Sequence, residues 1–270
     1  MGRTLAVANQ KGGVGKTTTT INLGAALATA DLRVLLVDLD PQGNATSGLG
    51  LDKNQLLHSI YDVLCGTVAA SEAVHSTELG SLDLLPANRD LTGATVELLG
   101  VDGRETQLKR ALSPLKDHYD FILVDCPPSL GIMTINALVA ADSLIIPMQA
   151  EYLALEGLSD LIQTIGRVRQ GINPSLHIEG VLLTMYDERL TLGGQIKENV
   201  KKHLGDRVFS TFIPRNVRLA ECPSFGKPIL LYDARSKGAE SHQRLAKELL
   251  RRMAPRPSPH NKTHPLRARP

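Results

Sequence analysis

The chain has 270 residues, a mass of 29.2 kDa and a formal net charge of +2, so it carries no global excess of either charge. No apolar run reaches the roughly 18 residues that indicate a membrane-spanning helix. Three cysteines without a CxxC pair exclude a disulfide framework and favour a reducing cytoplasm, and the eight histidines lack metal-binding spacing. Few aromatic residues and no tryptophan predict an aliphatic core.

A glycine-rich loop follows the first expected strand, residues 4–9. In order, its residues are Lys11, Gly12, Gly13, Val14, Gly15, Lys16, Thr17 and Thr18. The loop ends in the Gly-Lys-Thr of a P-loop, but Gln10 stands in place of the opening glycine. Backbone N–H groups of such a loop, and of the helix expected from 16 to about 29, can surround phosphate oxygens. The loop predicts that Lys16 reaches the β- and γ-phosphates and Thr17 binds Mg²⁺, while Lys11 needs an explanation of its own.

Two carboxylates lie at the carboxyl end of the second expected strand, residues 33–38. Asp38 ends this strand and Asp40 lies just beyond it. The carboxyl ends of parallel strands border the crevice in which open α/β sheets bind ligands. We expect Asp40 to hold or polarise a water aimed at the γ-phosphate, and Asp38 to face the Mg²⁺ shell. A polar loop with a helix cap is the alternative interpretation, which the neighbouring P-loop makes less favourable.

A third apolar run, residues 121–124 after Asp120, ends in Asp125. A hydrophobic strand that ends in Asp is the second metal-site element of P-loop NTPases, the Walker B strand. Such a run alone is weak evidence for a metal site, but its position after the P-loop and Asp40 strengthens that evidence. We expect Asp125 to hold Mg²⁺ through water.

The later segments continue the alternation of strands and helices. Strands are expected at 143–148, 179–184 and 208–213, and helices at 131–141, 154–170, 192–203 and 236–252. The pattern predicts an α/β fold, a mainly parallel twisted sheet with helices on both faces, in a single P-loop ATPase domain over residues 1–253. The tail, residues 254–270, is basic and rich in proline and is expected to be disordered.

Longer strings connect the chain to a family. They are NQKGGVGKTTT, VLLVDLDPQGNATSGLG, ILVDCPPSLG, ALEGL at 154–158 and IPRNVRLAECPSFGKPI at 213–229. With these strings the chain resembles the ParA/Soj group of chromosome- and plasmid-partitioning ATPases, within the deviant-Walker class that includes MinD. The resemblance extends from residue 3 to residue 253.

The resemblance implies an ATPase that uses ATP and Mg²⁺, has a slow intrinsic rate and forms a homodimer when ATP binds. Lys11 matches the family lysine that reaches the nucleotide of the other subunit. The ATP-bound dimer is expected to bind double-stranded DNA without sequence preference, and a ParB-type partner to stimulate hydrolysis and release it. The protein is then cytoplasmic and nucleoid-associated. The expected catalytic residues are Lys11, Lys16 and Asp40, and the expected metal-site residues are Thr17, Asp38 and Asp125.

The resemblance also places the adenine beside the loop at 213–216. Pro214 and Asn216 are the expected base contacts and Met185 is a weaker one, although a turn without a ligand role is the alternative for each.

Residues 251–270 carry six basic residues and no acid, which against the overall +2 leaves −4 for residues 1–250. DNA affinity must therefore come from a local patch or from the tail. The expected DNA-contacting residues are Arg189, Lys197, Lys201, Lys202, Arg215 and Arg218.

Two other functions compete with DNA partitioning. One is a MinD-like, membrane-associated positioning ATPase, and the other is a metabolic enzyme of the same superfamily, such as a ligase. A MinD-like protein needs a terminal amphipathic membrane helix. The apolar stripe of the last expected helix, Leu245, Ala246, Leu249 and Leu250, is instead interpreted as facing the core, so no membrane contact is expected.

Overall fold

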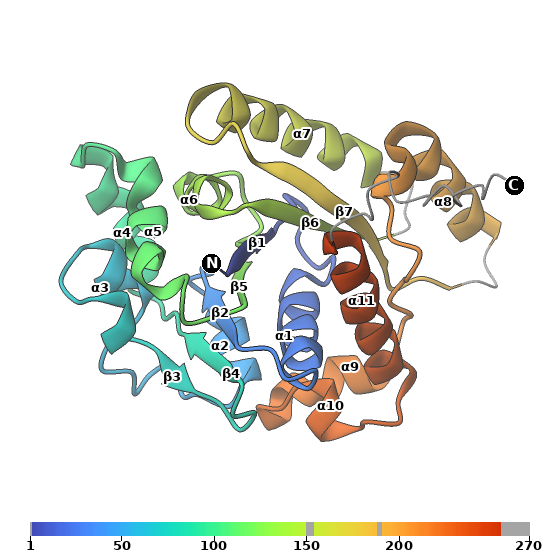
Figure 1. Ribbon diagram of the computed structural model, residues 1–270, viewed down its shortest axis with the longest axis horizontal. Coiled ribbons are helices and arrows are strands. Elements are labelled where there is room, and N and C mark those ends of the chain that lie inside the picture. Colours follow the sequence, from blue (N-terminus) through green and yellow to red (C-terminus); the bar gives the residue numbers. More distant parts are fainter. Residues whose placement is uncertain (1, 150–153, 188–190, 255–270) are drawn as a thin grey trace, which may run out of the picture.

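The protein, seen here as a computed structural model that describes residues 2–149, 154–187 and 191–254, is built on one seven-stranded sheet (Figure 1). The strand order is β3-β4-β2-β5-β1-β6-β7, and all neighbouring pairs are parallel except β3 and β4. The strands are β1 (Arg3–Val7), β2 (Val34–Asp38), β3 (His75–Ser76), β4 (Leu82–Leu85), β5 (Phe121–Asp125), β6 (Ser143–Gln149) and β7 (His177–Thr184). The expected α/β class is confirmed.

Helices connect the strands. The α-helices are α1 (Lys16–Ala28), α2 (Asn44–Gly48), α3 (Ile60–Leu64), α4 (Leu91–Glu97), α5 (Gln107–Leu112), α6 (Ile132–Ala140), α7 (Ala154–Gly171), α8 (Thr191–Leu204), α9 (Val217–Glu221), α10 (Ile229–Tyr232) and α11 (Lys237–Met253). Two 3₁₀ turns used below are η5 (Gly205–Arg207) and η6 (Cys222–Phe225). Within these described segments, none of the helices is both long enough and apolar enough to cross a membrane.

The alternation of side chains along the strands divides the core into two layers, one on each face of the sheet. On β5, Ile122 and Val124 face the layer that contains α6 and α7, whereas Phe121 and Leu123 face the layer that contains α1 and α11 (Figure 1). Period-two alternation in a strand buried on both sides produces this division. Helix α11 buries Leu245, Ala246 and Leu249 in the second layer, so the expected core-facing stripe is present.

The sheet register brings the candidate carboxylates together. Val7, the last residue of β1, is the register partner of Asp125 on β5, and Asp125 is also the partner of Asp38 on β2. The loop that follows β1 therefore lies beside both acids. Three segments far apart in sequence meet at one edge of the sheet because their strands are adjacent and parallel.

One expected strand does not form, and one expected segment lies outside the described residues. Residues 208–213 make only isolated bridges to the β7 side, at Val208 and at Pro214, so the prediction of a strand there is wrong. The physical reason is that the N–H groups of Ser210 and Thr211 bind the carboxylate of Glu248 instead of a strand. The tail predicted to be disordered begins at Ala254, and residues 255–270 lie outside the described part of the chain.

Candidate nucleotide and magnesium site

The loop between β1 and α1 has the shape of a phosphate cradle. Gly13 and Gly15 have φ angles of 73° and 84°, in the left-handed region that L residues with a Cβ seldom adopt. Gly15 directly precedes α1, so the free N–H groups of the helix start face the loop. The carbonyl of Val14 accepts a hydrogen bond from Thr184 Oγ1 at 2.8 Å, which ties the loop to the end of β7. The residues around this space are Gly12, Gly13, Gly15, Lys16, Thr17, Thr18, Asp40, Gln42, Asn44, Pro128 and Met185.

The two lysines of the loop occupy different surroundings. Lys16 is buried, and its Nζ donates to the carbonyl oxygen of Lys11 at 3.0 Å. Burial lowers the pKa of Lys16, while the negative charge of Asp125 opposes that shift. Lys11 is half-buried, and its N–H donates to Asn9 Oδ1 at 3.0 Å, so its backbone position is fixed. The ammonium of Lys16 thus lies inside the cradle, and the backbone of Lys11 supports it.

Asp125 lies at the centre of the metal-site candidates. Thr17 Oγ1 donates to its Oδ2 at 2.7 Å, and Thr20 Oγ1 donates to its Oδ1 at 3.1 Å. Burial, with the nearby charge of Asp38, raises the pKa of Asp125 to about 8. A divalent cation favours the ionised carboxylate, and Mg²⁺ prefers hard oxygen ligands with few protein contacts. The adjacent oxygens of Thr17 and Asp125 therefore fit Mg²⁺, and Thr20, which the sequence did not single out, orients the carboxylate.

Asp38 is placed differently from Asp125. Its Oδ2 accepts from the N–H and the hydroxyl of Thr46, both at 2.8 Å, and its Oδ1 accepts from the N–H of Asp40 at 3.2 Å. Burial raises the pKa of Asp38 to about 6, against these hydrogen bonds. Both oxygens hold the loop that carries Asp40, so the metal role of Asp38 stays a prediction and its visible role is structural.

Asp40 lies at the phosphate cradle itself. It is 8% exposed, and its Oδ1 accepts from the N–H of Gln42 at 2.9 Å. The same cavity is lined by Lys16 and Thr17, with a volume of about 330 Å³. Gln42 and Asn44, which follow Asp40 in the same loop, line it too and were missed, although polar residues just after a predicted strand end were a usable signal.

The three expected base contacts line one cavity. Met185, Pro214 and Asn216 border a space of about 180 Å³ that also reaches Gly15 and Thr18 of the P-loop. Met185 has φ 49°, and Asn216 Oδ1 accepts from the N–H of Leu219 at 3.3 Å, so it caps α9. This cavity adjoins the phosphate cradle, as a base pocket must. The further lining residues, missed from the sequence, are Thr19, Thr184, Ile213, Arg215, Leu219 and Ala220.

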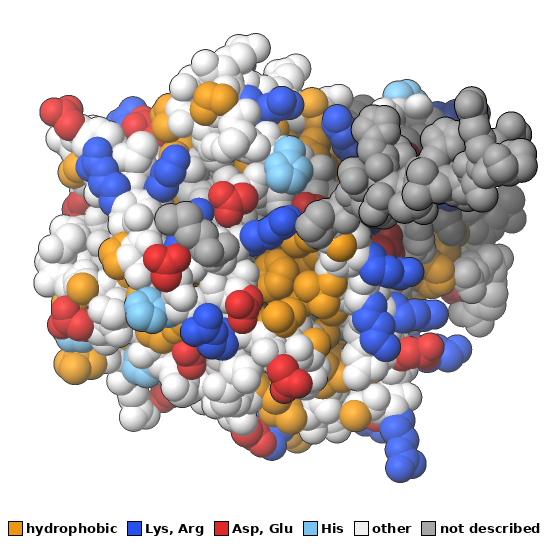
Figure 2. Space-filling view, in the orientation of Figure 1, with side chains coloured by type: hydrophobic (Ala, Val, Ile, Leu, Met, Phe, Trp, Pro, Cys, Tyr) orange, Lys and Arg blue, Asp and Glu red, His pale blue; other side chains and the backbone are white. Residues whose placement is uncertain are grey.

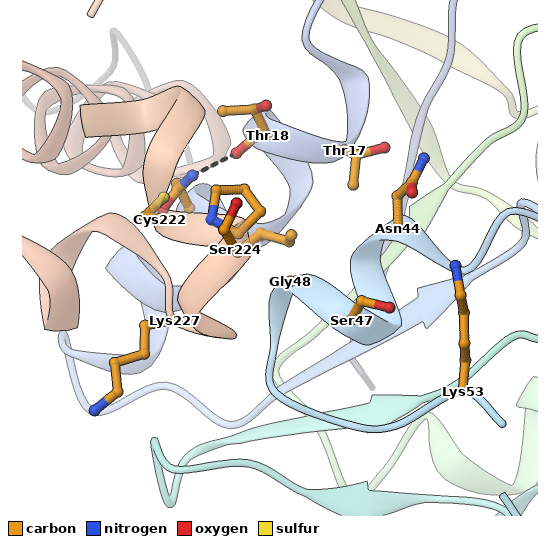
Figure 3. Close-up of a pocket in the computed structure, with 12 residues that line it drawn as sticks. Thr17, Thr18, Asn44, Ser47, Gly48, Lys53, Cys222, Ser224 and Lys227 are labelled. Carbon is orange, nitrogen blue, oxygen red and sulfur yellow. Dashed lines mark hydrogen bonds between the residues drawn. The ribbon is translucent and has the colours of Figure 1, made fainter. Parts of the chain in front are cut away.

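A second cavity, of about 440 Å³, adjoins the cradle on its other side (Figure 3). It lies between α1, α2 and η6, and Asn22 Nδ2 donates to the Thr18 carbonyl at 2.8 Å in its wall. Behind it, Gly50 and Gly226 approach so closely that a Cβ added to Gly226 would lie 2.6 Å from the Gly50 Cα. The residues labelled around it are Thr17, Thr18, Asn44, Ser47, Gly48, Lys53, Cys222, Ser224 and Lys227.

The expected DNA-contacting residues that the structure describes lie at different places on the surface, with Lys201 and Arg215 in separate grooves. Lys201 and Lys202 are exposed on α8, and Arg215 is exposed beside the base cavity. Arg218 is exposed but pairs with Glu221 at 3.0 Å and with Asp233 at 3.6 Å, which partly neutralises its charge. Arg189 and the side chain of Lys197 lie outside the described residues.

Comparisons with known proteins show the family of the chain. A family model described as an AAA domain matches residues 2–178. The chromosome partitioning protein ParA of Myxococcus xanthus is 55% identical over 256 residues, covering 95% of this chain and 90% of that protein. The sporulation initiation inhibitor protein Soj of Bacillus subtilis is 56% identical over 249 residues, covering 92% and 98%.

A solved structure shows the same fold with nucleotide and metal. It is named cobyrinic acid a,c-diamide synthase from Mycobacterium smegmatis, with a bound ATP analogue and magnesium. It is 44% identical, covers 93% of this chain and 95% of that one, and has a TM-score of 0.83. Its ligands are those that the P-loop, Thr17 and Asp125 fit here. On these similarities and this site, the chain belongs to the ParA/Soj family of chromosome-partitioning ATPases and uses ATP with Mg²⁺.

Proposed function

We propose that the protein segregates DNA, chromosomal or plasmid, through an ATP-bound dimer that binds double-stranded DNA without sequence preference. A ParB-type partner stimulates hydrolysis and thereby releases the dimer into the cytoplasm from the nucleoid. The relatives named chromosome partitioning proteins support this function. The amide-forming activity in the name of the M. smegmatis structure is that protein's own, and no residue described above favours it here.

The observation that carries the proposal is the presence of two lysines with different surroundings. Lys16 lies within the cradle and is bonded to the carbonyl of Lys11, so it serves the phosphates of its own subunit. Lys11 is half-buried, and its backbone is fixed by Asn9. We assign this second cation to the nucleotide of a second subunit. It would neutralise developing charge as an arginine finger does.

The remaining chemistry is assigned to the acids and hydroxyls of the site. Asp40 orients the attacking water, since phosphoryl transfer depends mainly on positioning and charge neutralisation. Thr17 and Asp125 hold Mg²⁺, which neutralises phosphate charge when bound. The hydroxyls of Thr17 and Thr20 align Asp125 and favour its ionised form, against the burial that raises its pKa. Met185, Pro214 and Asn216 hold the adenine.

The DNA surface is proposed to follow α11. Figure 2 shows Lys and Arg side chains gathered along the exposed side of this helix. Near the start of α11, Arg215 shares a groove with Lys237 and Arg244. Near its end, Lys201 shares another with Arg207 and Arg251. Helix α11 thus connects these two groups of cations, and such a stripe suits phosphates, not bases.

Affinity for one duplex DNA, measured with ATP, ADP and no nucleotide across a salt series, tests the proposal. ATP should raise the affinity, and the slope of log affinity against log salt should roughly double because a dimer doubles the phosphate contacts. Arg215→Glu should weaken binding at every sequence alike, whereas Arg110→Glu, an exposed arginine on α5, should not. Equal affinity in all three nucleotide states would reject nucleotide-controlled DNA binding. The partner is tested separately, by the rise in phosphate release when a ParB-type protein is added.

A further inference from the structure

The chain beside β7 leaves the regular ladder between Phe209 and Ile213. Phe209 N–H donates to the carbonyl of Val181 at 2.9 Å, and Ile213 N–H donates to the carbonyl of Leu183, also at 2.9 Å. In a regular parallel ladder, successive donors and acceptors are two residues apart on each chain, so Thr211 would donate to Leu183. Ile213 takes that place instead. The segment therefore contains a bulge of two additional residues, here called the 210–212 bulge.

The bulge is followed by a smaller irregularity in the segment that continues β7. Tyr186 N–H donates to the carbonyl of Ile213 at 3.0 Å, one residue later along β7 than a regular ladder would have it. The additional residue is Met185, which has φ 49° and lines the base cavity. The Tyr186 and Phe212 rings then pack with centroids 4.7 Å apart. Both irregularities lie where these two segments of the chain approach the proposed base pocket.

The carboxylate of Glu248 binds the backbone that the bulge releases. Its Oε1 accepts from the N–H of Ser210 and its Oε2 from the N–H of Thr211, each at 2.8 Å. Glu248 is 6% exposed, and these bonds lower its pKa against the opposing effect of burial. Ser210 is exposed and Thr211 half-buried, so Glu248 gives these two N–H groups a fixed, charged acceptor in place of water and thereby holds the bulge in one geometry.

Arg252, one turn later on α11, completes the arrangement. Its Nη2 lies 2.7 Å from Glu248 Oε1 and 2.7 Å from the carbonyl of Val208, and its Nη1 donates to the carbonyls of Glu179 and Asp206 at 3.3 and 3.2 Å. The guanidinium also lies 4.2 Å over the Phe209 ring. On the other side of that ring, a Cβ on Gly180 would lie 2.5 Å from Phe209 Cε2, so only glycine leaves room for it.

We propose that Glu248 and Arg252 are positioning residues for nucleotide-base binding, which they control by fixing the 210–212 bulge. Without the bulge, Pro214 and Asn216 would move along β7 by two residues, about 7 Å, which removes them from the cavity beside Gly15 and Thr18. The two residues contact neither base nor phosphate and act through the loop that follows the bulge. This inference rests on the proposed base pocket of Met185, Pro214 and Asn216.

The experiment compares two ligands of the full chain in the presence of Mg²⁺: ADP, which has a base, and pyrophosphate, which has none. Glu248→Gln keeps the size of the side chain but provides a single acceptor oxygen, and Arg252→Met removes the guanidinium that supports it. Each variant should bind ADP about tenfold more weakly, as expected for losing a hydrogen bond to a charged group. Affinity for pyrophosphate should not change, because the P-loop is untouched.

Gln243→Met is the matched control, since Gln243 is an exposed polar residue on the same helix as Glu248 and Arg252. It should leave both affinities unchanged. A folded Glu248→Gln or Arg252→Met variant with an unchanged ratio of ADP to pyrophosphate affinity would overturn the inference, because a merely structural role lowers stability alone. If the unmodified protein itself does not prefer ADP over pyrophosphate, the proposed base pocket fails instead.

Discussion

The phosphate half and the base half of the site are held by different kinds of structure. The phosphate cradle lies between β1 and α1, and the neighbouring strand β5 forms regular ladders with β1 on one side and with β2 on the other. The base cavity lies at the β7 edge, where the ladder contains the 210–212 bulge and side chains of α11 replace strand partners. The proposed chemistry thus lies on the interior of the sheet, and the proposed base recognition lies on an edge that a distant helix shapes.

The largest expected effect comes from Lys11→Ala, which tests whether the phosphate half is complete within one subunit. Nucleotide binding should be kept, since Lys16 remains, but ATP-dependent dimers should be lost. The rate of phosphate release should fall by about 10³, as for loss of an arginine finger. Sedimentation with ATP and a phosphate-release assay measure both, with Gln10→Ala as the control. Dimers that persist while hydrolysis falls would make Lys11 a catalytic finger only.

The next effect is expected from Asp40→Ala within the same half. The variant should bind ATP and dimerise, but hydrolyse it about 100-fold or more slowly, because the water is no longer oriented. Single-turnover phosphate release measures this. Asp52→Ala, which removes an exposed carboxylate in the loop after α2, is the control. A normal rate in Asp40→Ala would remove Asp40 from the water-positioning role.

Helix α11 contacts both α1, which follows the phosphate cradle, and the 210–212 bulge. Its buried residue His242 offers a test of how the helix contributes to stability. This side chain is fully buried, its Nδ1 lies 2.8 Å from the Gly238 carbonyl oxygen, and its Nε2 has no hydrogen-bond partner among the described residues. Burial lowers the pKa of His242 from 6.5 to about 4. Between these values the unfolded chain binds more protons than the folded one, so stability falls as the pH drops from about 6.5 towards 4.

The size of that loss can be measured by urea unfolding at pH 7 and pH 5. The unmodified protein should lose about 2 kcal/mol more than His242→Asn over this range. His177→Asn, at an exposed histidine, should behave like the unmodified protein. An equal loss in His242→Asn would mean that His242 does not couple protonation to unfolding.

The smallest effect is expected at Asn216, in the base half. Asn216→Ala removes the α9 cap and should lower the free energy of unfolding by about 1 kcal/mol. Asn216→Asp keeps an acceptor for the Leu219 N–H but loses the amide donor, so stability should be kept while ADP binding weakens. Urea unfolding and ADP titration separate the two roles. If Asn216→Asp binds ADP normally, the side chain is a cap and not a base contact.

The difference between the phosphate half and the base half also determines what could be predicted from the sequence. Most residues that line the phosphate cradle can be singled out from the sequence, because a P-loop and strand-terminal acids are local patterns that a parallel sheet brings together. The role of Asp38 within its own loop was not visible, because it depends on Thr46 folding back onto it. Strand β4, with four residues, is too short for its apolar run to distinguish a strand from a helix.

The base half was predicted by resemblance and not by pattern. The apolar residues from Val208 to Ile213 favoured a strand, and β-propensity carries no information about a carboxylate that arrives from position 248. Thr184 could have been predicted as a residue of this cavity, because a polar residue at the end of the expected strand 179–184 is a usual ligand position. The dependence of the bulge on Glu248 and Arg252 required the tertiary structure.

The dependence of the bulge on α11 also has a consequence for synthesis. Ribosomes deliver the chain from its N-terminus, so Ser210 and Thr211 emerge well before Glu248 and Arg252. The phosphate cradle, by contrast, has its strands β1, β2 and β5 within the first 125 residues. A nascent chain can therefore assemble the cradle early, whereas the segment at 210–212 obtains its hydrogen-bond partners only when the last helix has been translated. Binding of a base in the proposed pocket then requires that translation has passed α11, whereas the phosphate cradle can form before that point.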